Sequence, residues 1–193
     1  MKKLLTTISL ALTLCLSLTT VFAAPSINKN GAVKKDSILI NGEKVDANTT
    51  AAFDSKKETY SAAGVSDETI DVIEKVNANP SQLASLIKGV DLSGYSLLTE
   101  FQDLSVYVNG ELKQKVKNVT LTWEVPNLVK TAKNVKVLHY STERNTWEIL
   151  TPKSVDFDNK TITQEFKDLS PVAVIYQAGD ANANKNGTKA NST

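Results

Sequence analysis

The chain has 193 residues, with 22 lysines and arginines against 21 aspartates and glutamates, a formal charge of +1 and a single histidine. This balance provides no basic field for nucleic acid, so no nucleic-acid partner is expected. The single cysteine, Cys15, excludes an intrachain disulfide and a cysteine-rich metal site. The composition therefore favours a protein stabilised by the packing of one apolar core.

The first segment is typical of a secretory signal peptide. Lys2 and Lys3 form its basic start, an apolar run follows, and Val21 to Ala24 provide a small-residue exit. Cleavage after Ala23 removes both lysines and leaves 20 basic against 21 acidic residues, a formal charge of −1. We therefore expect a bacterial-type signal peptide over residues 1–23, secretion to the extracellular space and no stable membrane insertion after cleavage.

Residues 24–63 are predicted to form a flexible lead-in that contains one β-hairpin. Up to Lys35 the chain has too few apolar side chains to offset the entropy of ordering. The pair Asn41-Gly42 follows β-branched residues and predicts a tight turn, because both residues tolerate positive φ, so a hairpin is expected over 37–45. The polar, alanine-rich stretch over 46–63 has no period and predicts a linker.

A two-helix segment is expected over residues 64–90. Ser66 is a suitable cap for a helix from Asp67 to Asn77, and Asn79-Pro80 predicts the start of a second helix that ends at Gly89. The apolar residues of both helices recur at helical spacing and are interpreted as core. These are Ile70, Val72, Ile73, Val76, Leu83, Leu86 and Ile87.

From Leu104 onward the hydrophobic period changes from about 3.6 to about 2, which is typical of half-buried strands. At least six such strands follow, separated by turn signals that include Asn109-Gly110 and Pro126. The predicted fold class is therefore mainly β, an antiparallel β-sandwich over residues 97–176 preceded by the short two-helix segment and the hairpin. Residues 177–193 lack an apolar period and are expected to form a disordered tail.

Few residues are candidates for a metal-binding, cofactor-binding or sugar-binding role. His139 lies within a predicted strand, and one histidine without cysteine does not make a zinc site, so neither a metal nor a cofactor is expected. Asp156 to Asn159 lacks the downstream glutamate of a calcium loop and is interpreted as a hairpin turn. Trp123 and Trp147 also lie in predicted strands, where exposed rings would stack on sugars and buried rings would belong to the core.

Three stretches near the end of the chain form a recognisable set. They are Val137 to Ser141, Trp147 to Leu150, and Phe166 to Val174, the last of which contains Leu-Ser-Pro-Val-Ala-Val. Together they resemble a β domain that is common in secreted and surface proteins of Gram-positive bacteria. The resemblance covers about residues 119–176 and implies an extracellular domain without a known activity.

The same ending is distantly similar to the autoproteolysis site of adhesion-receptor domains, where His-Leu-Ser or His-Leu-Thr precedes the last strand. That resemblance implies a hydroxyl that attacks the preceding carbonyl with the help of a histidine. At the matching place this chain has Asp168, Leu169 and Ser170, with Asp168 in the position of the histidine. A second triplet, His139-Tyr140-Ser141, resembles the His-Phe-Ser of intracellular relatives and implies His139 as base and Ser141 as nucleophile.

These observations favour a secreted, non-enzymatic binding or scaffolding protein of the cell envelope or extracellular space, with an unidentified glycan or protein as its partner. Two alternatives stay open. One is a carbohydrate-binding module that uses exposed rings of Trp123 and Trp147. The other is a self-cleaving domain that acts at His139-Tyr140-Ser141 or before Ser170.

Overall fold

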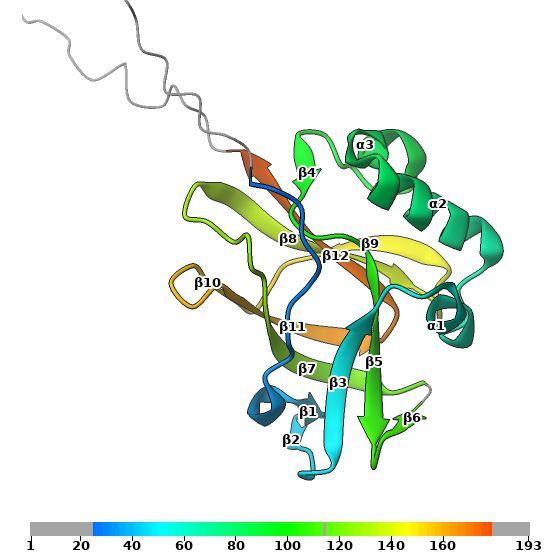
Figure 1. Ribbon diagram of the computed structural model, residues 1–193, viewed down its shortest axis with the longest axis vertical. Coiled ribbons are helices and arrows are strands. Elements are labelled where there is room, and N and C mark those ends of the chain that lie inside the picture. The colour runs from blue at the N-terminus through cyan, green and yellow to red at the C-terminus, as the bar shows by residue number, and fades with distance from the viewer. Residues whose placement is uncertain (1–24, 114, 179–193) are drawn as a thin grey trace, which may run out of the picture. The chain divides into compact units, whose positions relative to one another are not determined.

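The structure is a computed structural model that describes residues 25–113 and 115–178. The predicted signal peptide over 1–23 and residues 179–193 of the predicted tail lie outside this part of the chain. The described part is mainly β, and its strands form two antiparallel sheets in a sandwich (Figure 1). The predicted fold class is confirmed.

The first sheet has five strands in the order β10-β11-β7-β1-β2. Its longest pairing joins β11 to β7, from Thr161 opposite Glu124 to Asp168 opposite Lys117. The strands are β1 (Leu39–Ile40), β2 (Glu43–Lys44), β7 (Lys117–Glu124), β10 (Ser154–Asp156) and β11 (Thr161–Asp168).

The second sheet has seven strands along the path β3-β5-β12-β8-β9, with β4 on β12 and β6 on β5. β12 pairs with β5 at Pro171 and Val172, and beyond Asp103 the two strands diverge, so that β6 takes the place beside β5 from Val106 to Val108. The strands are β3 (Thr49–Asp54), β4 (Tyr95–Leu97), β5 (Gln102–Val108), β6 (Glu111–Lys113), β8 (Ala132–Ser141), β9 (Thr146–Leu150) and β12 (Pro171–Ala178).

The core has two parts, one on each face of the seven-stranded sheet. Because side chains alternate along a strand, β8 supplies both: Val135 and Val137 point between the sheets, and Leu138 and Tyr140 point to the outer face. The outer face is covered by the helices, whose apolar stripe of Ile70, Ile73 and Val76 is fully buried. The alternating side chains of the seven-stranded sheet thus pack against the other sheet on one face and against the helices on the other.

The helices are α1 (Lys57–Ala62), α2 (Asp67–Ala78) and α3 (Leu83–Leu86), with single 3-10 turns at Lys35–Ser37 and Pro80–Gln82. Ser66 caps α2 as predicted, since its hydroxyl accepts a hydrogen bond from the backbone N–H of Thr69 at 3.3 Å. The second predicted helix is shorter than expected, because α3 ends at Leu86 and the chain is already extended at Ile87.

Both predicted Asn-Gly turns are present. Asn41 and Gly42 have φ of 53° and 83° between β1 and β2, which confirms the N-terminal hairpin. Asn109 and Gly110 have φ of 55° and 80° between β5 and β6. Left-handed φ at both central residues is the geometry that makes this pair favourable in tight hairpins.

The predicted linker over 46–63 is wrong, because this stretch contains β3 and α1. β3 pairs with β5 from Thr49 opposite Val108 to Asp54 opposite Asp103. Its alanines produce no contrast between apolar and polar faces, so the strand exists through backbone pairing with β5 and leaves no period in the sequence. The sandwich therefore begins well before Leu97, and at its other end β12 includes Gln177 and Ala178, which had been assigned to the tail.

Residues 28–34, predicted to be flexible, lie against both sheets, and we call them the N-terminal strap. Figure 1 shows this segment as the dark-blue trace that leads to β1. The Gly31 N–H donates to the Glu124 carbonyl at 2.8 Å, and the Glu124 N–H donates to Ala32 at 3.0 Å. Asn30 is buried, accepts from the Trp123 indole at 3.0 Å and donates its backbone N–H to Gln102 at 2.6 Å. Hydrogen bonds order the strap, together with the partial burial of Val33 against the core.

Candidate functional site at one end of the sandwich

The four residues singled out for self-cleavage, His139, Ser141, Asp168 and Ser170, lie together at one end of the sandwich. His139 and Ser141 are at the end of β8, Asp168 ends β11, and Ser170 lies in the crossing from β11 to β12, which belong to different sheets. The antiparallel register places Val172 opposite His139, so Ser170 reaches the last residues of β8. The two separate candidate sites therefore form one site.

Ser170 is fully buried and has two polar neighbours. Its hydroxyl donates to the Tyr140 carbonyl, and its Oγ lies 2.9 Å from Nε2 of His139. A hydroxyl has a single proton, and in this geometry that proton points to Tyr140. His139 donates to Ser170 in the tautomer that carries the proton on Nε2.

The other nitrogen of His139 faces a carboxylate. Nδ1 lies 3.5 Å from Oε2 of Glu148 and has no hydrogen-bond partner among the described residues. Burial lowers the pKa of His139, and the charges of Asp168 and Glu148 oppose that effect. Because burial is the larger influence, the imidazole is neutral at neutral pH, and the contact with Glu148 becomes an ion pair only when the ring is protonated. The imidazole of His139 therefore lies between the carboxylate of Glu148 and the hydroxyl of Ser170.

Ser141 belongs to a different set of contacts. Its hydroxyl donates to the Asp168 carboxylate, 2.9 Å from Oδ2, and accepts from the backbone N–H of Arg144 at 3.2 Å. The resemblance implied His139 as the base for Ser141, whereas the structure pairs Ser141 with Asp168 and His139 with Ser170.

Arg144 joins the two sets of contacts. Its Nη2 lies 2.8 Å from Oδ1 of Asp168, and its Nε and Nη2 lie 2.7 and 2.9 Å from the two oxygens of Glu148. Hydrogen bonding to Arg144 is the largest influence that lowers the pKa of Glu148. We call the six residues His139, Ser141, Arg144, Glu148, Asp168 and Ser170 the polar cluster.

Sequence reasoning missed Arg144 and Glu148. The signal was present in the polar turn that separates two strand patterns, because pairing those strands as a hairpin places Glu148 opposite His139. The observed β8 and β9 have this register, with Tyr140 opposite Trp147. Glu148 could therefore be predicted as the neighbour of His139 from the register of the hairpin, although no motif indicates it.

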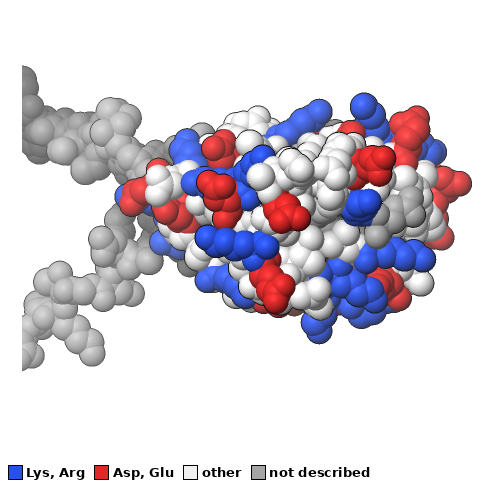
Figure 2. Space-filling view, turned by 90° about the horizontal axis from the view of Figure 1, so that it is seen from below, with Lys and Arg blue, Asp and Glu red and all other residues white. Residues whose placement is uncertain are grey.

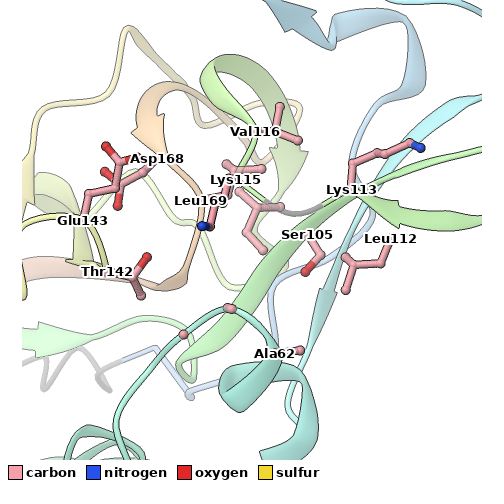
Figure 3. A pocket seen from close by; sticks show the side chains of 13 residues that line it. Ala62, Ser105, Leu112, Lys113, Lys115, Val116, Thr142, Glu143, Asp168 and Leu169 are labelled. Atoms are coloured by element: carbon pink, nitrogen blue, oxygen red, sulfur yellow. The ribbon is translucent and has the colours of Figure 1, made fainter.

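A cleft of about 140 Å³ opens beside the polar cluster, where β5 and β12 diverge. The end of α1, the β5–β6 hairpin and the crossing before β12 form its walls. Asp168 and Glu143 lie on one side of it, and Leu112 and Lys113 lie on the other (Figure 3). Asp168 and Leu169, which line this cleft, directly precede Ser170 in the chain.

A second buried aspartate lies on β5. Asp103 is fully buried, accepts from the Ser105 hydroxyl at 2.6 Å through Oδ2, and has no partner for Oδ1 among the described residues. Burial raises the pKa of Asp103 to about 6, and the charge of Asp54 adds to this, while the hydrogen bond from Ser105 opposes it. Unlike Asp168, this carboxylate has no cation beside it in the described part of the chain.

The two tryptophans do not form a common platform. Trp123 is fully buried between the sheets, and its ring contacts Phe53 and Phe166 at centroid distances of 5.8 and 6.2 Å. Trp147 is half-buried on the helix side, 5.0 Å from the Tyr140 ring and edge-on to it. Trp123 therefore has no ring face for a sugar in this fold.

Asp156 ends β10, and one of its carboxylate oxygens accepts the backbone N–H groups of Asp158 and Asn159, in the turn to β11, at 3.0 and 2.9 Å. The predicted hairpin turn is confirmed. Within residues 25–113 and 115–178, no group of three or more His, Cys, Asp and Glu side chains is arranged to hold a metal ion.

In comparisons with known proteins, no family model, no curated protein and no solved structure matches this chain. None of the helices in the described part has both the length and the apolar character needed to cross a bilayer. Basic and acidic side chains are interspersed over the face of the molecule that Figure 2 shows.

Proposed function

We propose that the protein is a secreted, non-enzymatic binding or scaffolding protein of the bacterial cell envelope or extracellular space. One observation carries the non-enzymatic part: both candidate nucleophiles, Ser141 and Ser170, are 0% exposed and hydrogen-bonded to protein groups. An external substrate does not reach either hydroxyl in this fold. The predicted signal peptide and the resemblance of the last strands to Gram-positive surface domains support the location.

A protein partner is favoured over a glycan. The carbohydrate-binding alternative depended on two exposed rings, and Trp123 is fully buried while Trp147 contacts Tyr140 and Phe101. The cleft beside the polar cluster is instead lined by aliphatic and charged side chains, among them Leu112, Lys113 and Lys115. Such a lining suits peptide side chains better than the stacked faces of sugars.

The test is where the protein is found and what it binds. We expect the form that begins at Ala24 in the culture medium or wall fraction, and co-sedimentation of that purified form with envelope preparations at moderate salt. Intact mass gives the start of the chain. A species that retains Met1 and stays inside the cell, or a secreted form that sediments with no envelope material, would contradict the proposal.

A second candidate function is self-cleavage between Leu169 and Ser170, favoured by the 2.9 Å contact of Ser170 Oγ with His139 Nε2 and by Glu148 behind the ring. In such a reaction His139 takes the hydroxyl proton, Oγ attacks the Leu169 carbonyl carbon, and the Ser170 nitrogen leaves with that proton. Water then hydrolyses the resulting ester to a Leu169 carboxylate and a free Ser170 amine.

The ground state does not have this proton arrangement. The Ser170 hydroxyl donates to the Tyr140 carbonyl, so its proton must turn toward Nε2 of His139, and Nε2 must be unprotonated, before His139 acts as a base. This is why binding comes first in our proposal.

Intact mass of the purified protein separates the two candidates, since cleavage yields two fragments that meet between Leu169 and Ser170. Ser170→Ala should abolish the fragments, and Ser141→Ala, which removes a hydroxyl 2.9 Å from a carboxylate instead, should leave them. A single uncleaved mass, also after hydroxylamine treatment, would eliminate self-cleavage.

A further inference from the structure

The cleft beside the polar cluster is a consequence of the strand pairing. β5 leaves β12 after Asp103, and the chain after β6 crosses to β7 in the other sheet, so side chains from β5, β6 and the crossing before β12 surround an unfilled space. Its volume of about 140 Å³ is enough for one small apolar group. The space therefore suits a single branched side chain rather than a large cofactor.

The apolar part of the lining includes an exposed leucine. Leu112 on β6 is 37% exposed, and within the described part of the chain it is the one large hydrophobic side chain in the exposed class. It lines the cleft together with Val116 and Leu169, which are both partly buried against the core. A single exposed leucine is ordinary on a protein surface, but beside Val116 and Leu169 it extends the apolar wall of the cleft, which an apolar group of a ligand can cover.

The charges around the cleft are unequal. Its two acidic residues are already paired, Glu143 with Lys117 at 2.6 Å and Asp168 with Arg144 at 2.8 Å. Lys113 and Lys115 also line the cleft and form no ion pair within residues 25–113 and 115–178. The charge left for a ligand is therefore positive, and the complementary ligand is anionic.

The backbone of β6 is also available. β6 pairs with β5 through Val106 to Val108, and among the described strands it has no second neighbour. A free strand edge beside an apolar pocket is the arrangement that binds an extended peptide, because the edge binds the main chain and the pocket receives one side chain. This favours a peptide over a free fatty acid, which needs no strand edge.

We propose that this cleft binds an extended acidic peptide segment of a partner protein. One aliphatic side chain enters between Leu112, Val116 and Leu169, and the neighbouring carboxylates face Lys113 and Lys115. The inference rests on the proposed function as a binding protein and names the chemistry of its partner.

The test uses the mature chain, residues 24–193, and an acetylated, amidated peptide Asp-Glu-Leu-Asp-Glu with a fluorescent label, measured by anisotropy. Replacing leucine by serine in the peptide, or its acids by amides, should each weaken binding at least about tenfold. Affinity should also fall as salt rises, because exposed charges are screened. These peptide controls do not depend on the folding of any protein variant.

The matched protein variants are the double changes Lys113→Glu with Lys115→Glu, and Lys88→Glu with Lys133→Glu. Both change the net charge equally, and Lys88 and Lys133 are exposed and outside the cleft. We expect at least a tenfold loss of peptide affinity for the first pair and less than a twofold change for the second. Leu112→Ser should also weaken binding at least about fivefold.

Several outcomes would overturn the inference: no binding of the acidic peptide, equal losses for both lysine pairs, indifference to the leucine, or binding of a fatty-acid anion in place of the peptide. Failure of the proposed function looks different. If the wild-type protein still sediments with envelope material and the Lys113 and Lys115 pair does not matter, the cleft assignment fails while the binding function stands.

Discussion

Two buried aspartates at the same end of the molecule differ in how their charge is compensated. Asp168 has Arg144 at 2.8 Å and the Ser141 hydroxyl at 2.9 Å, so its negative charge has partners on two sides. Asp103 has the Ser105 hydroxyl on one oxygen and no described partner on the other, and its pKa is raised to about 6. A buried carboxylate that no cation faces, such as that of Asp103, tends toward the neutral form.

The largest expected effect comes from removing the cation of the paired site. Arg144→Ala leaves the buried Asp168 and the half-buried Glu148 without their partner. Because the Arg144 side chain is 37% exposed, solvent screens part of the interaction, and the free energy of unfolding at pH 7 should fall by about 2 to 3 kcal/mol. Urea denaturation measures the change. Arg144→Lys keeps the charge but loses the forked geometry and should recover about half. A loss below about 1 kcal/mol for Arg144→Ala would mean that the pair does not stabilise the fold.

The next effect removes the uncompensated charge. The folded pKa of Asp103, about 6, lies above the ordinary pKa of an aspartate, about 3.9, so stability from this group is fully present below about pH 4 and is lost as pH rises through 6. Asp103→Asn should therefore be more stable than wild type by about 2 kcal/mol at pH 8 and nearly equal to it at pH 4. Denaturation curves at both pH values measure this, and a variant less stable at pH 8 contradicts it.

A smaller effect compares the two serines that donate to these aspartates. Ser105→Ala removes the described donor to Asp103, whereas Ser141→Ala leaves Asp168 with Arg144. At pH 8 we expect losses of about 1.5 kcal/mol for Ser105→Ala and about 0.5 kcal/mol for Ser141→Ala. If Ser141→Ala lowered the stability more than Ser105→Ala, the ion pair with Arg144 would not explain the difference between Asp168 and Asp103. Thermal unfolding of the two variants side by side gives the order.

The smallest expected effect is on the acid side and comes from His139. Its pKa is lowered by burial, so the neutral ring stabilises the fold above its unfolded pKa of about 6.5, and this contribution is lost as pH falls through the folded pKa. His139→Gln should flatten the acid limb of the stability profile. The pH dependence of stability that His139 causes has the opposite sign to the one that Asp103 causes. If the acid limb of the profile is unchanged in His139→Gln, the loss of stability at acid pH comes from other groups.

How far the site was predictable depends on the range of the interactions involved. Four residues were recognisable as candidates: His139, Ser141, Asp168 and Ser170. The sequence paired His139 with Ser141, whereas His139 contacts Ser170, because the β8–β12 register decides which serine lies beside the histidine. Arg144 and Glu148 match no motif, and only the register of the β8–β9 hairpin shows that Glu148 lies opposite His139. The cleft matches no motif either, because it exists only where β5 and β12 part.

Local rules in the sequence determined the Asn-Gly turns, the Ser66 cap, the buried stripe of α2 and the alternation that makes a sandwich. Each depends on residues within one turn or a few positions of one another, where backbone sterics and side-chain period act directly. The tertiary structure alone decided that the alanine-rich stretch from Thr49 becomes β3, that the strap lies against Glu124, and that Ser170 meets His139. Those contacts join residues far apart in the chain, and their pairing depends on the register and burial of the completed sheets.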